Sequence, residues 1–127
     1  MSTLTSKPIL IGILFVFTLL SGLLVSNAGR PLNSGLFAIH KLVAVATTIL
    51  LGVSIYQQLK SGSFLTAVGL LVLVLTAALF TALFISGALL SFEIELPWMV
   101  LKVHQVAPLL SLAFSAATVY LLINNPA

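Results

Sequence analysis

Residues 64–90 decide the fold of this chain: they read FLTAVGLLVLVLTAALFTALFISGALL and contain no charged side chain. A hydrocarbon core of about 30 Å is crossed by an α-helix of roughly 20 apolar residues. Strands of a membrane barrel would alternate between lipid-facing and lumen-facing side chains, and this stretch does not alternate. The stretch therefore predicts a transmembrane helix.

Three further apolar runs of similar length lie on either side of it. The first opens with a proline at a position that a helix start tolerates. The breaks between the runs contain Gly, Pro, Asn and Ser, which interrupt helices. Because these breaks are short, neighbouring helices must alternate in direction. The sequence predicts an all-α membrane protein, a four-helix up-down bundle in a single domain of residues 1–127, with helices at about Pro8–Ser26, Leu36–Gln58, Phe64–Leu90 and Pro97/Trp98–Ile123.

Composition supports a multi-pass integral membrane protein. Of 127 residues, 61% are hydrophobic and 6% charged, with a mean hydropathy of +1.29, whereas soluble domains carry about 25% charged residues. Cysteine is absent, which excludes disulfides and thiolate chemistry. The five basic residues form no run, so no nucleic acid is expected as a partner. Lys7 and the following apolar run resemble a signal peptide, but the run is long and has a later counterpart, so we expect a retained helix.

That counterpart belongs to an internal repeat. The segment around His40, FAIHKLVA, aligns with LKVHQVAP around His104, and a tyrosine follows each histidine by sixteen residues. One position out of this register, Ser21-Gly22 corresponds to Ser86-Gly87. The chain therefore reads as two tandem helix hairpins that share one orientation in the membrane.

The repeat places the two histidines at one depth. His40 and His104 lie four to six residues inside their predicted helices, about 6–9 Å from one surface at 1.5 Å per residue. A pseudo-two-fold axis between the helices would direct the imidazoles toward each other. Ionisable residues inside membrane helices indicate a functional site, although a histidine can also simply form a hydrogen bond between helices.

A matched pair of imidazoles favours haem over a bare metal ion. Zinc and copper require further ligands, and Glu93 and Glu95 are expected outside the membrane. Haem requires only two axial ligands from the protein. The residues one to three turns after each histidine are mostly small, which leaves room for a flat macrocycle or simply lets helices approach. They are Ala44, Thr47, Thr48 and Gly52 on one helix, and Pro108, Ser111, Leu112 and Ala116, with Ala107 and Ser115 beside them, on the other.

Two further features bear on the site. Pro108 removes the helical partner of the His104 carbonyl and would adjust the ring by a kink, unless it is an ordinary tolerated proline. Arg30, Lys41 and Lys102 lie on the histidine side, where they would pair with haem propionates or reach the interface by snorkelling. The tyrosines and Trp98 are interpreted as interfacial aromatic belts.

The segments AIHKLVAVATTILLGVSIY (38–56) and LKVHQVAPLLSLAFSAATVYLL (101–122) resemble the haem-ligating helices of b-type membrane cytochromes, the group that includes ferric-reductase-like transmembrane domains. The resemblance implies one haem b and electron transfer. Members of that group usually hold two haems through four histidines. With two histidines, electrons cannot cross the membrane on haem alone, so a transmembrane role would require quinone or a partner protein.

The sequence thus favours a small membrane cytochrome that binds one bis-histidine haem b between its second and fourth helices. We expect single-electron transfer from a membrane reductant such as quinol to a redox partner on the histidine side, and no independent catalytic residue set. One alternative is a cofactor-free membrane subunit or small carrier with structural or proton-relay histidines. Another is a haem chaperone or sensor. Homodimerisation is compatible with each of these functions.

Overall fold

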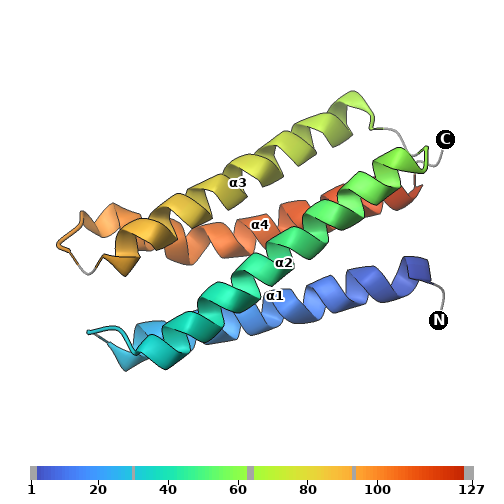
Figure 1. Cartoon of the computed structure of the whole chain (residues 1–127). Helices are drawn as coiled ribbons and strands as arrows, with labels where there is room; N and C mark the ends of the chain where they lie inside the picture. The colour runs from blue at the N-terminus through green and yellow to red at the C-terminus, as the bar shows by residue number, and fades with distance from the viewer. Residues whose placement is uncertain (1–2, 30, 63–64, 93, 125–127) are drawn as a thin grey trace. The chain divides into compact units, whose positions relative to one another are not determined.

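The computed structural model describes residues 3–29, 31–62, 65–92 and 94–124, and in those ranges it contains four helices and no strand. The helices are α1 (Thr3–Ala28), α2 (Ser34–Lys60), α3 (Ala67–Ser91) and α4 (Trp98–Asn124) (Figure 1). Each is long and apolar enough to cross a membrane, α1 over Lys7–Ala28 and the others over their full length. The predicted all-α class with four membrane-crossing helices is confirmed.

Local hydrogen bonds set where the helices begin and end. Asn33 Oδ1 accepts the Leu36 N–H at 3.0 Å before α2, and Thr66 Oγ1 accepts the Gly69 N–H at 3.1 Å at the start of α3. These side chains satisfy backbone donors that a first helical turn leaves unpaired. After α1 the chain passes through Gly29 at a φ of 74°, a left-handed conformation that glycine adopts without a Cβ clash.

Two predicted helix starts require correction. The helix α1 begins five residues before Pro8, which lies inside it, because the polar residues ahead of the apolar run also take helical conformation. Proline costs one backbone hydrogen bond there. The helix α3 begins at Ala67, behind its Thr66 cap, and Phe64, where the apolar run opens, lies outside the described residues. Hydropathy marks the membrane-crossing length, whereas capping residues decide the ends.

The chain divides into two compact units, Met1–Ser54 and Ile55–Ala127. The first contains the helix hairpin of α1 with most of α2, and the second contains the hairpin of α3 with α4 (Figure 1). Within each hairpin the two helices run in opposite directions and are joined by a short loop. The boundary between the two units lies inside α2, six residues before its end at Lys60.

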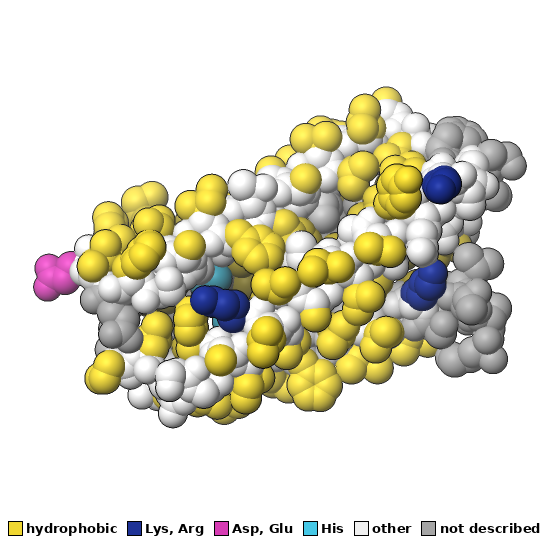
Figure 2. Space-filling model, in the orientation of Figure 1, with side chains coloured by type: hydrophobic (Ala, Val, Ile, Leu, Met, Phe, Trp, Pro, Cys, Tyr) yellow, Lys and Arg dark blue, Asp and Glu magenta, His cyan; other side chains and the backbone are white. Residues whose placement is uncertain are grey.

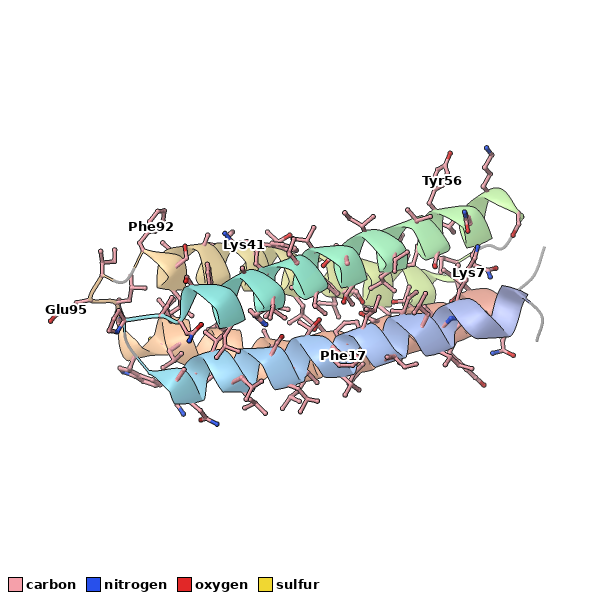
Figure 3. The ribbon with its side chains drawn as sticks, turned by 60° about the horizontal axis from the view of Figure 1, so that its bottom comes forward. Lys7, Phe17, Lys41, Tyr56, Phe92 and Glu95 are labelled. Carbon is pink, nitrogen blue, oxygen red and sulfur yellow. The ribbon has the colours of Figure 1, made fainter. Side chains whose placement is uncertain are left out.

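Side chains are distributed as a lipid solvent requires. Hydrophobic side chains cover most of the face that Figure 2 shows, and the labelled Phe17 and Tyr56 point outward, 57% and 63% exposed (Figure 3). Among the described residues, seven buried side chains are polar and five are hydrophobic. Lipid supplies no hydrophobic drive between helices, so small and hydroxyl side chains form the contacts. The buried polar residues are Ser21, Thr47, Thr76, Ser86, Ser111, Ser115 and Thr118.

Candidate functional site

In the first hairpin, His40 of α2 is held by the α1 segment that carries Ser21. His40 Nδ1 lies 3.0 Å from Ser21 Oγ and 3.1 Å from the Thr18 carbonyl oxygen. The Ser21 hydroxyl itself donates to the same Thr18 carbonyl at 3.0 Å. Two turns further along α2, Thr47 Oγ1 lies 3.2 Å from Thr18 Oγ1. The histidine is therefore part of a polar contact between α1 and α2.

The second hairpin repeats this arrangement. His104 Nδ1 of α4 lies 2.8 Å from Ser86 Oγ of α3, and the Ser86 hydroxyl donates to the Leu83 carbonyl at 3.2 Å. Further along the same pair of helices, Thr76 Oγ1 and Thr118 Oγ1 are 3.3 Å apart. Each hairpin thus joins one serine and one histidine at one end and a pair of threonines further inside.

These contacts assign a tautomer to the neutral His40 ring. A carbonyl oxygen only accepts, so His40 Nδ1 donates its proton to the Thr18 carbonyl and the Ser21 hydroxyl. In the second hairpin, Ser86 Oγ lies 3.2 Å from the Leu83 carbonyl oxygen and 2.8 Å from His104 Nδ1, an arrangement that is compatible with the same tautomer. In a neutral imidazole with the proton on Nδ1, the lone pair lies on Nε2, the atom that would coordinate a metal.

A glycine beside each serine makes room for the imidazole. A Cβ on Gly22 would lie 3.0 Å from His40 Cε1, and a Cβ on Gly87 would lie 3.1 Å from His104 Cε1. Both distances are shorter than ordinary carbon–carbon contacts of about 3.5–4.0 Å. Each ring therefore packs against a backbone surface that only glycine provides, and the Ser-Gly pair accounts for both the orientation and the close approach of each histidine.

The two histidines occupy equivalent positions in their helices. The helices α2 and α4 are both 27 residues long, and His40 and His104 are each the seventh residue. Each ring thus lies about 9 Å from the start of its helix. Hydroxyl residues follow each histidine at seven-residue spacing, Thr47 in α2, and Ser111 and Thr118 in α4. A spacing of seven keeps them on nearly one helix face.

The other predicted residues around the histidines differ in burial: some are partly buried, some are buried and some are exposed. Ala44 and Pro108 are partly buried, Pro108 lies inside α4, and Ser111 is fully buried with its hydroxyl donating to the Pro108 carbonyl at 2.9 Å. Of the remaining small residues, Gly52 and Ala116 are exposed, while Thr47, Ala107 and Ser115 are buried. Thr47 contacts α1, so at this position the small side chain serves helix packing.

The predicted basic partners lie near the helix starts. Lys41 and Lys102 are exposed, and Lys41 Nζ lies 4.9 Å from the centre of the Phe37 ring, one turn nearer the start of α2. This direction is typical of a lysine that reaches toward the membrane interface. Arg30 and Glu93 lie outside the described residues. Glu95 is exposed in the loop between α3 and α4 (Figure 3).

Sequence reasoning missed the partners of the histidines. In the sequence the Ser-Gly pairs mark the repeat, and in the structure they contact the histidine rings. The signal was present, because Ser21 precedes His40 by nineteen residues and Ser86 precedes His104 by eighteen. Two antiparallel helices joined by a short loop bring such positions to one depth.

No cluster of three or more His, Cys, Asp or Glu side chains occurs in the part of the chain that the structure describes. Comparisons with known protein families, with curated proteins and with solved structures find no match.

Proposed function

We propose that this protein is a small membrane cytochrome in which His40 and His104 are the axial ligands of one b-type haem near one membrane face. The repeated serine–histidine hydrogen bond supports the proposal, because it orients both rings in the same way through Nδ1. Ligating histidines nearly always donate their other ring N–H to a carbonyl, carboxylate or hydroxyl group in this way.

The residues fit such a group chemically. A porphyrin provides four nitrogens of its own, so two imidazoles complete the coordination of its iron. Haem supplies a one-electron couple when bound. The chain would hold the two rings and orient them through Ser21 and Ser86. Haem held by both histidines would be left without an open position for an exogenous ligand.

The partners follow from the position of the histidines. Both lie about two turns from the start of a membrane-crossing helix, so electrons would enter or leave at that face. Lys41 and Lys102 lie within two residues of the ligands and are the described cations that would pair with propionates. Arg30, outside the described residues, would be a third. A membrane quinol as donor and a docked redox protein as acceptor complete the proposal.

A second candidate function is favoured by the same hydrogen bonds. Each serine–histidine pair is a polar contact between two helices, which stabilises a membrane hairpin by itself. A cofactor-free membrane subunit or small carrier would need nothing more from these residues. The two functions differ in a measurable way, since only a cytochrome retains haem.

Removal of each ligand tests the assignment. We expect His40→Ala and His104→Ala each to lose the spectrum of a low-spin haem in detergent-purified protein, and exogenous imidazole to restore part of it by filling the vacated axial position. Gln105→Ala, an exposed neighbour of His104, is the matched control and should retain the wild-type spectrum. Wild-type haem content in either histidine variant would contradict the proposal.

A further inference from the structure

Ser115 is an exception among the buried hydroxyls of the protein. Its side chain is 3% exposed, and Ser115 Oγ has no hydrogen-bond partner among the described residues. Buried polar atoms nearly always form a hydrogen bond to protein or to ordered water, so an unpartnered one requires an explanation. Within a membrane the requirement is stronger, because lipid offers no hydrogen bonds.

The neighbouring hydroxyls show what Ser115 could have done instead. Ser111 Oγ donates to the carbonyl three residues earlier in α4, and Thr118 Oγ1 donates to the carbonyl four residues earlier. Thr76 in α3 and Thr47 in α2 donate back in the same way. This bond requires only a side-chain rotation. Ser115 has the same type of backbone acceptor available and does not use it, so its hydroxyl lacks the partner that the others have.

Polar atoms suited to a small ligand surround this position in sequence. Ser111 and Thr118 precede and follow Ser115 by four and three residues on α4, and both are fully buried. Side chains at these spacings have Cβ atoms about 5–6 Å apart. One water with hydrogen bonds of about 2.8 Å on each side bridges two hydroxyl oxygens up to about 5.6 Å apart, which is within reach of side chains at these spacings. The Ser111 and Thr118 hydroxyls each donate their one hydrogen to a carbonyl but keep lone pairs that accept.

We propose that Ser115 binds one internal water molecule, which bridges its hydroxyl to a neighbouring hydroxyl of α4. The site is independent of the histidines, since Ser115 lies eleven residues, about 16 Å, beyond His104 along the helix. An internal water typically makes two to four hydrogen bonds to otherwise unsatisfied groups. It would give Ser115 its missing partner and stabilise the hairpin.

Solid-state NMR of the full chain in lipid bilayers tests this directly. With serine and threonine labelled, magnetisation transferred from water should reach Ser115. Thr47 is the control, because it is 2% exposed and its hydroxyl is already bonded to the Val43 carbonyl, so it should receive no such signal. Equal absence of water transfer at Ser115 and Thr47 would overturn the proposal.

Thermal unfolding supplies a second readout. A water bridge predicts that Ser115→Ala lowers the midpoint by about 2–8 °C, whereas an unpartnered hydroxyl predicts an unchanged or higher midpoint after its removal. An unchanged or higher midpoint in Ser115→Ala would therefore contradict the water site. If the variant does not fold, the wild-type NMR experiment decides alone.

Discussion

Ser86 Oγ lies 2.8 Å from Nδ1 of His104, and this contact has a counterpart of 3.0 Å between Ser21 and His40. In each hairpin the serine lies in the first helix and the histidine in the second. The residue after the serine is the glycine on which the ring packs. The two hairpins therefore present their histidines by one local mechanism, and each feature of that mechanism can be removed separately.

Removal of either serine should change the redox properties of the proposed haem. Ser21→Ala and Ser86→Ala each withdraw a hydroxyl acceptor from Nδ1–H. The ring becomes a poorer donor to iron, so we expect haem affinity to fall by about 10–100-fold. A tenfold loss confined to the oxidised state would raise the midpoint potential by about 59 mV. Potentiometric titration of purified protein measures the shift.

Thr48→Ala is the matched control for the serine variants. It removes a hydroxyl of α2 that donates to the Ala44 carbonyl and makes no described contact with His40. Its potential should equal that of the wild type. A serine variant whose potential and haem affinity are both unchanged would show that the hydroxyls do not orient the ligands.

Substitution of the glycines should destabilise the hairpins whether or not haem binds. In Gly22→Ala or Gly87→Ala the new methyl group meets the imidazole at 3.0–3.1 Å, and a shift of the ring breaks its bond to serine. Overpacking of this kind costs about 1–3 kcal/mol. Thermal unfolding followed by circular dichroism provides the measurement.

The control for these variants is Gly12→Ala in α1. A Cβ at Gly12 meets nothing within 4 Å, so alanine only removes the conformational freedom of glycine. We expect this variant to be stabilised by about 0.5–1 kcal/mol. Equal effects of alanine at positions 12, 22 and 87 would mean that the glycines are not selected by the histidines.

The threonine pair of the second hairpin should show measurable coupling. Thr76 and Thr118 contact each other at 3.3 Å, and each hydroxyl also reaches a carbonyl of its own helix. A double-mutant cycle with valine at both positions isolates the contact between the helices. Hydrogen bonds between membrane helices average about 0.6 kcal/mol in such cycles.

An exposed threonine of the same helix calibrates that cycle. Thr81 of α3 is exposed and donates to the Ala77 carbonyl of the same helix. Thr81→Val therefore removes a hydrogen bond within α3 and no described hydrogen bond to α4. Its effect should be additive with that of Thr118→Val. A coupling energy indistinguishable from zero between Thr76 and Thr118 would place the stability of this contact in apolar packing instead.

Much of the fold follows from the sequence because lipid imposes a simple rule. The charge-free run at 64–90 and its three counterparts leave no alternative to helices, and the short loops pair them into hairpins. The helix ends were less accessible. The start of α3 depends on the hydroxyl of Thr66, and α1 continues through polar residues ahead of Pro8, neither of which hydropathy detects.

The site was predictable only in part for a related reason. Position along a helix can be counted, so the equivalent positions of His40 and His104, each the seventh residue of its helix, follow from spacing. The partner of each ring depends on how one helix is rotated against the next, and sequence spacing does not determine that rotation. Ser21 and Ser86 therefore became recognisable as histidine partners only in three dimensions.

The absorption spectrum of the purified wild-type protein, recorded before and after reduction with dithionite, tests the central claim most directly. The proposed cytochrome predicts an intense Soret band that shifts and sharpens on reduction, with resolved alpha and beta bands of a low-spin bis-histidine haem. A colourless protein, even after haem is supplied during expression and after purification, would contradict the claim. The paired histidines would then be contacts between helices of a cofactor-free membrane protein.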